Sequence, residues 1–139
     1  MKRKQIFLIT GSVLVVIILI FATIRIFQPA SKSVQKNEAE FMFGASALVN
    51  EFMTDEQMAN SLYLDKVIQV NGIIDNIADD GSVVVVSIKE LNGVSGVLCS
   101  FDKNMLLGKE LKTGDEITVK GICTGYLLDV VLTKCSLEE

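Results

Sequence analysis

Residues 111–137 read LKTGDEITVKGICTGYLLDVVLTKCSL, two β-branched runs with turn residues before and between them. Val, Ile and Thr favour the pleated strand, whereas glycine next to aspartate or threonine favours a turn. The pattern predicts strands at Glu116–Thr124 and Tyr126–Cys135, with Thr124–Gly125 as a tight turn between them. Together they form the closing hairpin of the fold.

Three further strands are predicted upstream, each bounded by turn residues. They are Lys66–Ile77, Ser82–Ile88 and Val97–Asp102. In the first strand the more apolar alternate positions are expected to face inward: Ile68, Val70, Gly72 and Ile74. A short helix is expected at Lys103–Leu111, between the third and fourth strands. This order of elements is that of an OB-fold, a five-stranded Greek-key barrel, so residues 65–139 are predicted to form one.

A helical segment is predicted to precede the barrel, over residues 38–64. Its apolar positions recur at intervals of three and four from Phe41 to Leu62, the spacing of one helix face. Thr54–Asp55 followed by Glu56 has the composition of a new N-cap, which predicts two helical pieces or one kinked helix. The apolar stripe is expected to pack on the barrel, and the alternative is that it docks on a partner. The fold class is therefore all-β with an added N-terminal helix.

The first 27 residues contain an apolar run. Residues 6–24, IFLITGSVLVVIILIFATI, carry no charge over nineteen positions, which is long enough for a helix to cross a bilayer. We expect an uncleaved transmembrane anchor behind a short cytoplasmic stub, and a cleaved signal peptide is the alternative. Residues 28–37 are polar and read as a linker.

The position of this anchor predicts where the domain lies. A short basic start, Lys2–Lys4, followed at once by a long apolar run is the layout of an export signal, although Arg25, Lys32 and Lys36 oppose it in charge. We expect a single-pass membrane protein with its C-terminal domain outside the cytoplasm.

Three stretches of this sequence resemble the tRNA_anti-like family of small bacterial OB domains, which are often lipoproteins or membrane-anchored. They are NEFMTDEQMANSLYLDKVIQVNGII at residues 50–74, VLCSFD at residues 97–102 and the closing hairpin at residues 111–137. The resemblance covers roughly residues 45–137. It implies an OB barrel in a protein of the bacterial inner membrane. By analogy with anticodon-binding barrels it also implies a nucleic-acid ligand, but a fold alone does not fix a function.

Charge and aromatic content argue against nucleic acid. From residue 28 onward the chain has nine lysines, no arginine and seventeen carboxylates, a net charge of −8, which repels a phosphate backbone. Single-strand binders also need aromatic platforms on the barrel face. After Asp65 the only rings are Phe101, which has the parity of a core residue, and Tyr126, which is the one candidate contact.

Catalytic and metal sites find little support. The chain has no histidine, so a nucleophilic cysteine or serine would lack its usual base. The carboxylates Asp75, Asp79, Asp80, Asp115 and Glu116 lack the spacing of a calcium loop and are interpreted as turn-formers and surface charges. We therefore predict a protein that is not an enzyme and needs no cofactor or metal.

Three cysteines lie on the last three predicted strands. With a tight turn before Tyr126, Cys135 would lie near Gly114, roughly 30 Å along the ribbon from Cys123, too far for a bridge. The third and fifth strands of an OB barrel run parallel, so Cys99 and Cys135 are the expected disulfide pair of an exported domain. The alternative is three buried thiols, which suits Cys123 in particular.

These observations favour a noncatalytic, membrane-anchored OB-fold module of the cell envelope that binds a protein or another envelope component. Two alternatives stay open. One is binding of single-stranded nucleic acid, and the other is a structural or assembly role in which the helix docks on another membrane protein. A basic, aromatic groove would favour the first, and an exposed apolar helix face the second.

Overall fold

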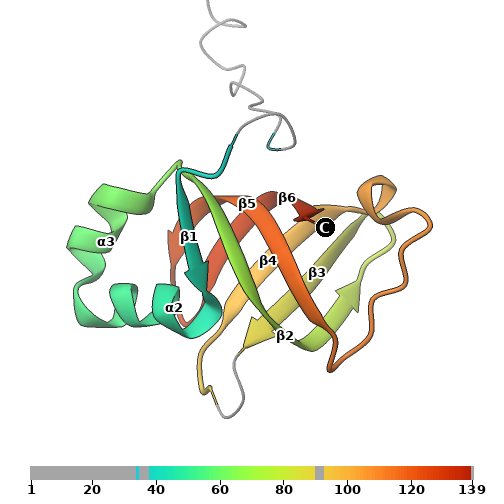
Figure 1. The fold of residues 1–139 in the computed structure, drawn as a ribbon, viewed down its shortest axis with the longest axis horizontal. Helices are drawn as coiled ribbons and strands as arrows, with labels where there is room; N and C mark the ends of the chain where they lie inside the picture. The colour runs from blue at the N-terminus through green and yellow to red at the C-terminus, as the bar shows by residue number, and fades with distance from the viewer. Residues whose placement is uncertain (1–33, 35–37, 90–92, 139) are drawn as a thin grey trace, which may run out of the picture. The chain divides into compact units, whose positions relative to one another are not determined.

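The computed structural model of this chain describes Val34, residues 38–89 and residues 93–138. Figure 1 shows the fold of these residues as a barrel of strands with two helices beside it. In chain order the elements are β1 (Phe41–Gly44), α2 (Ala45–Thr54), α3 (Glu56–Tyr63), β2 (Val67–Asp79), β3 (Val83–Lys89), β4 (Val97–Asp102), the 3-10 helix η2 (Lys103–Leu106), β5 (Glu116–Tyr126) and β6 (Val130–Glu138).

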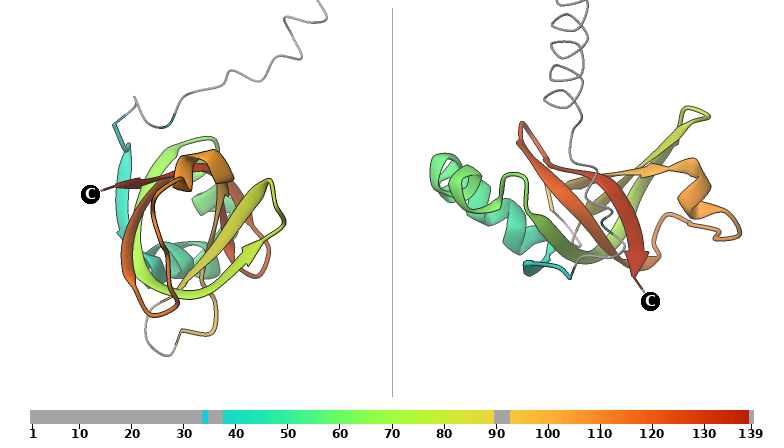
Figure 2. Two further views of the ribbon diagram at one scale, coloured as in Figure 1. Left: turned by 90° about the vertical axis from the view of Figure 1, so that its right-hand side faces the viewer. Right: turned by 90° about the horizontal axis from the view of Figure 1, so that it is seen from above.

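Five of the strands close into a barrel. The strand order is β1-β2-β3-β4-β6-β5, and an additional pairing of β2 with β5 completes the ring. The left view of Figure 2 looks into this ring. The closure is possible because β2 is long. Its first half pairs with β5, and its second half, from Ile73 onward, pairs with β3 across a bulge between Ile74 and Asn76. Strand β4 runs parallel to β6. This is the topology of the predicted OB-fold.

The barrel interior is filled by alternate residues of each strand. The predicted inward set on β2 is confirmed, since Ile68, Val70, Gly72 and Ile74 are all buried. The other strands contribute the remaining core: Val84, Val86 and Ile88 from β3, Val97, Cys99 and Phe101 from β4, Val119 and Cys123 from β5, and Val130, Leu132 and Cys135 from β6. Period-two alternation therefore predicts most of the interior, and Cys135 on β6 is buried out of phase because a register shift precedes it.

The start of the helical segment was predicted wrongly, because Phe41–Gly44 is a strand. Strand β1 runs parallel to β2, with Phe41 beside Ile68 and Phe43 beside Val70. It occupies the flank of β2 that β3 does not reach, and its two phenylalanines add to the inward apolar face. The predicted break between two helical pieces is present: Asp55 is the N-cap of α3, and its Oδ1 accepts a hydrogen bond from the Met58 N–H at 2.9 Å.

The turn of the closing hairpin also differs from the prediction. Strands β5 and β6 pair as far as Tyr126 with Val130, so the turn is formed by residues 127–129. Gly125, with φ +127°, lies at a register shift within the ladder instead of in a turn. Asp129 supplies the turn chemistry, since the Leu127 N–H donates to its carbonyl oxygen at 3.2 Å.

Two further expectations concern helices. The helix expected at Lys103–Leu111 is one 3-10 turn, and Gly108, with φ +81°, lies in a backbone conformation that does not continue a helix. The expected anchor at residues 6–24 lies outside the described residues, as does most of the linker at 28–37. Within the described part of the chain, no helix has the length and apolar character needed to span a membrane.

Candidate functional site

The outer face of β3 and β4 is where an OB-fold usually binds its ligand. Here the half-exposed side chains of that face are small or neutral, with Val85 opposite Ser100 and Ser87 opposite Leu98. At the edge of this face, the Lys89 ammonium forms an ion pair of 3.0 Å with Asp75 on β2. This part of the barrel therefore offers neither a stacking ring nor an unneutralised cation.

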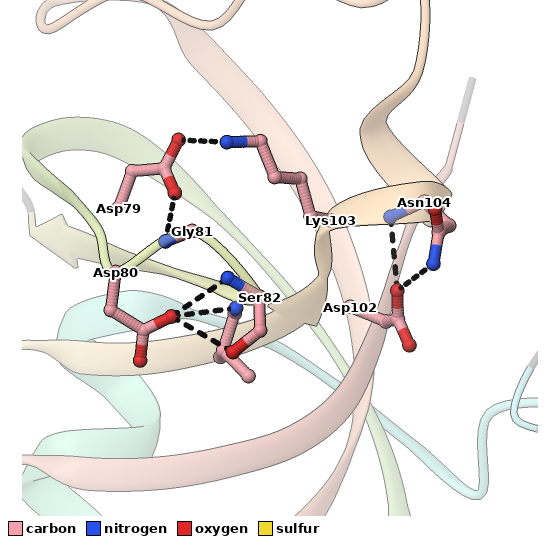
Figure 3. A network of polar contacts seen from close by, with 8 residues as sticks. Asp79, Asp80, Gly81, Ser82, Asp102, Lys103 and Asn104 are labelled. Atoms are coloured by element: carbon pink, nitrogen blue, oxygen red, sulfur yellow. Dashed lines mark hydrogen bonds and ion pairs between the residues drawn. The ribbon is translucent and has the colours of Figure 1, made fainter.

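The loop between β2 and β3 is held by its own carboxylates, as Figure 3 shows. Asp80 Oδ1 accepts hydrogen bonds from the Ser82 N–H at 3.0 Å and the Val83 N–H at 2.8 Å. Asp79 Oδ1 accepts from the Gly81 N–H at 2.8 Å, and its Oδ2 pairs with Lys103 at 2.8 Å. These bonds hold the pKa of each carboxyl below its usual range. For Asp79 the largest cause is the hydrogen bond from Lys103, followed by the one from the Gly81 N–H. For Asp80 it is the hydrogen bond from the Val83 N–H, followed by the one from the Ser82 N–H.

Two more carboxylates have the same structural role. Asp102 Oδ1 accepts from the Asn104 N–H at 2.9 Å and so caps η2. Asp115 Oδ2 accepts from the Lys112 N–H at 3.0 Å in the turn before β5. The interpretation of Asp79, Asp80 and Asp115 as turn-formers is thus confirmed. Among the residues that the structure describes, no cluster of three or more acidic, cysteine or histidine side chains could hold a metal ion.

Five of the rings in the described part of the chain are used to join the helices to the barrel. Tyr63 on α3 meets Phe41 and Phe43 of β1 edge-on, with ring centroids 5.0 Å and 5.4 Å apart. Phe52 on α2 lies 6.0 Å from Tyr63 and stacks on Tyr126 of β5 at 5.7 Å. The candidate contact Tyr126 is consequently half-buried beside α2 and is not a free platform. Phe101, by contrast, is buried as its parity predicted.

An exposed apolar turn lies at the opposite end of the barrel from the carboxylate loop. Leu127 and Leu128 in the β5–β6 turn are 85% and 80% exposed. The turn is fixed to the start of β4, since Asp129 Oδ1 accepts from the Gly96 N–H at 2.6 Å and the Val130 N–H donates to the Gly96 carbonyl at 3.0 Å. Sequence reasoning missed this feature because the leucines were assigned to a strand; the signal for it was a pair of leucines directly before an aspartate.

The three cysteines are buried free thiols in the structure. The Cys99 and Cys135 thiols are hydrogen-bonded neighbours, and the disulfide between them stays a prediction for the exported protein. The hydrogen bond to Cys135, together with burial, raises the pKa of the Cys99 thiol well above its ordinary value. Burial also raises the pKa of Cys123, the predicted buried thiol. The expected position of Cys135 near Gly114 was wrong: with the turn at 127–129, Cys135 lies beside Gly121.

Known proteins place this architecture in context. The barrel and its helices resemble the crystal structure of a candidate nucleic acid-binding lipoprotein from Klebsiella pneumoniae subsp. pneumoniae MGH 78578, with a TM-score of 0.60 and 19% identity over 81% of this chain and 100% of that chain. A candidate aspartyl-tRNA synthetase from Leishmania major Friedlin gives a TM-score of 0.50 and 12% identity, over 84% of this chain and 25% of that chain. At such identities the likeness shows the fold alone.

No curated protein matches the sequence. The model of the tRNA_anti-like family, however, matches residues 1–137, almost the whole chain. The protein therefore belongs to the tRNA_anti-like family.

Proposed function

We propose that this protein is a noncatalytic binding module of the bacterial cell envelope, anchored in the inner membrane by residues 6–24, whose ligand is a protein or another envelope component. The observation that carries the proposal is that the aromatic rings and the carboxylates of the described residues have structural roles in the fold. Rings that a nucleic-acid binder would present on β3 and β4 instead join the helices to the barrel. Carboxylates that could serve in acid–base catalysis form turns.

Single-stranded nucleic acid is the second candidate, because the similar Klebsiella structure is that of a candidate nucleic acid-binding protein. The net charge of −8 from residue 28 onward opposes it. Fluorescence anisotropy of labelled single-stranded DNA and RNA, titrated with the full chain, separates the two. We expect no saturable binding at physiological salt. Binding in the micromolar range that weakens with salt would favour nucleic acid and overturn the proposed ligand class.

The proposed location has its own support in the apolar run at residues 6–24 and in the lipoprotein described for Klebsiella. An engineered cysteine can test it, because the three native thiols are buried and protected in the folded chain. Thr113→Cys, in an exposed turn, should react with a membrane-impermeant maleimide in intact bacterial cells. Gln5→Cys, before the anchor, is the matched control and should react only after lysis. The opposite pattern would overturn export.

A further inference from the structure

Cys99 and Cys135 lie side by side inside the barrel, on adjacent strands. Strands β4 and β6 pair in parallel with Cys99 beside Leu132, and the next buried, inward residue of β6 is Cys135. A hydrogen bond joins the two thiols, so their sulfurs are in contact. A disulfide needs α-carbons within about 7 Å of each other, which neighbouring strands allow. The folded barrel therefore holds this pair close to the geometry of a disulfide.

The backbone of the closing hairpin brings Cys135 to this position. A bulge in β6 places Lys134 and Cys135 together opposite Gly121. Lys134 is exposed with a φ of +53°, and Cys135 takes the inward place that regular alternation after Leu132 would give to Lys134. Gly121 leaves room for the sulfur, since a Cβ there would stand 2.7 Å from the Cys135 Sγ. A rare lysine conformation and a glycine thus both serve to place this thiol beside Cys99.

The third cysteine is placed differently. Cys123 on β5 and Cys99 on β4 both lie beside Leu132, on opposite sides of β6. Two strand spacings, about 9–10 Å, separate them, which is too far for a disulfide. The Cys123 sulfur is instead a hydrogen-bond partner of the Gly125 backbone. The structure thus distinguishes one pair of thiols from one single thiol.

Burial decides when the pair can be oxidised. Cys99 and Cys135 are 0% and 1% exposed, so an oxidant does not reach them in the closed barrel. The hydrogen bond to Cys135 and burial also raise the pKa of the Cys99 thiol well above its ordinary value. Thiol–disulfide exchange needs a thiolate in contact with the disulfide of the oxidant, and the folded barrel provides neither. Oxidation must therefore precede closure of the barrel, and closure then preserves the redox state in which the chain folded.

We propose that Cys99 and Cys135 are a modification site, which a dithiol–disulfide oxidoreductase of the envelope oxidises to a disulfide before the barrel closes. One thiolate attacks the disulfide of the oxidoreductase and forms a mixed disulfide. The second thiolate then displaces the oxidoreductase and completes the bond between Cys99 and Cys135. The chain loses two electrons and two protons, and the disulfide of the oxidoreductase becomes a dithiol.

The disulfide joins β4 to β6 and leaves Cys123 as a thiol. Its formation in the cell rests on the proposed export, because such oxidoreductases work in oxidising compartments. The pairing itself does not depend on export, so the two can be tested separately.

The pairing is tested on the purified full chain in detergent micelles. The reduced chain is unfolded in urea and refolded with oxidised glutathione, and a second sample is kept folded with the same oxidant. We expect the refolded chain to lose two hydrogen atoms in mass and two of its three titratable thiols, with Cys99 and Cys135 joined in a proteolytic digest. The sample kept folded should be oxidised at least about tenfold more slowly.

Cys123→Ala is the matched control and should form the disulfide as the wild type does. Cys99→Ala and Cys135→Ala should not form it. Because the disulfide closes a long loop, it should raise the urea midpoint of unfolding by about 1 M or more, in the wild type and in Cys123→Ala alike.

Three outcomes would contradict the proposal. A disulfide that includes Cys123, or a bridged chain that is less stable than the reduced chain, would overturn the assigned pair. Equal oxidation rates of the folded and unfolded chains would overturn the requirement that oxidation precedes closure. If no sample forms an intramolecular disulfide, the modification site itself is overturned.

The state of the pair in bacterial cells is measured by acid quenching and alkylation in denaturant, before and after reduction. We expect two of the three thiols to react only after reduction. A chain that forms the disulfide when purified but holds three thiols in cells, and whose Thr113→Cys variant labels only after lysis, would overturn export and support the pairing. A chain that is exported and still holds three thiols would overturn the modification alone.

Discussion

Gly121 is a residue at which the barrel leaves no room for a side chain. It lies on β5 opposite a bulge in β6, where Lys134 takes a φ of +53° and turns Cys135 inward. A Cβ at this position would stand 2.7 Å from the Cys135 Sγ, closer than such atoms approach one another, and 3.0 Å from the Leu132 Cβ, which is a tight contact. The Cys135 sulfur therefore occupies the space that a side chain at position 121 would need.

Gly121→Ala is expected to destabilise the fold by about 1–3 kcal/mol, the usual cost of overpacking a core, as measured by urea unfolding. In a Cys135→Ala background the same change should cost less, because the nearest contact has been removed. Ala78→Val, an exposed position on β2, is the control and should have little effect. An equal cost of Gly121→Ala in both backgrounds would contradict this packing.

Tyr126 gives a second test at the residue scale. Had the ring been an exposed contact, its loss would leave stability nearly intact. The ring is half-buried and stacks on Phe52, so Tyr126→Ala should lower the free energy of unfolding by about 1–3 kcal/mol. Tyr126→Phe keeps the stack and should cost less than about 0.5 kcal/mol, as measured by thermal unfolding. Identical melting temperatures for Tyr126→Ala and the wild type would show that the ring is not structural.

Among the elements, the loop between β2 and β3 depends on ionised carboxylates. Folding lowers the pKa of Asp80 below its ordinary 3.8, chiefly through hydrogen bonds from the Val83 and Ser82 N–H groups. A lowered pKa contributes stability above that ordinary value, and the contribution is lost as the pH falls through the folded pKa. Asp80→Asn should therefore lose less stability than the wild type when the pH is lowered from about 5 to about 2.5.

The measurement is thermal unfolding of both proteins across that range, and the variant Asp55→Asn is the control for a carboxylate in another element. Asp79 also has a lowered pKa, through Lys103 and Gly81, so some acid sensitivity should persist in Asp80→Asn. Parallel pH profiles for the wild type and Asp80→Asn would contradict the role assigned to this carboxylate.

Local sequence signals predict some elements of this fold and miss others. The alternation along β2 and the N-cap at Asp55 depend on neighbours in the chain, and both were predictable. Strand β1 exists because Phe41–Gly44 meets a free flank of β2, which is a long-range event that periodicity cannot reveal. The helical spacing that includes Phe41 competes with that pairing, and the tertiary contact wins.

The candidate functional site was harder to predict than the barrel. Sequence reasoning named Tyr126 because it was the last ring in the strands, but whether a ring is free depends on what packs on it, here Phe52. Leu127 and Leu128 were assigned to a strand, because the apolar run continues through them into Val130. Only the pairing of Tyr126 with Val130 shows that they form the turn.

At the scale of the whole molecule, barrel closure encloses all three cysteines. Cys99 and Cys135 come from the parallel strands β4 and β6, and Cys123 comes from β5. Each is at most 1% exposed, so a reagent reaches them only when the barrel opens. Alkylation of the native protein should therefore proceed at the rate of unfolding, and should accelerate in urea along with the loss of β structure.

Folding also holds the Cys99 and Cys123 thiols in the protonated form, and this gives the stability of the barrel a pH dependence. The pKa of Cys99 is raised by its Cys135 neighbour and by burial, and that of Cys123 by burial. The thiols of the unfolded chain ionise near pH 9.0. Above that pH ionisation stabilises the unfolded state more than the folded state. The thiol contribution to stability is thus complete below pH 9.0 and is lost as the pH rises. Urea unfolding from about pH 8 to about pH 10.5 should show this decline, and Cys123→Ala should reduce its slope. A decline of equal slope in that variant would mean that Cys123 ionises as readily in the folded barrel as in the unfolded chain.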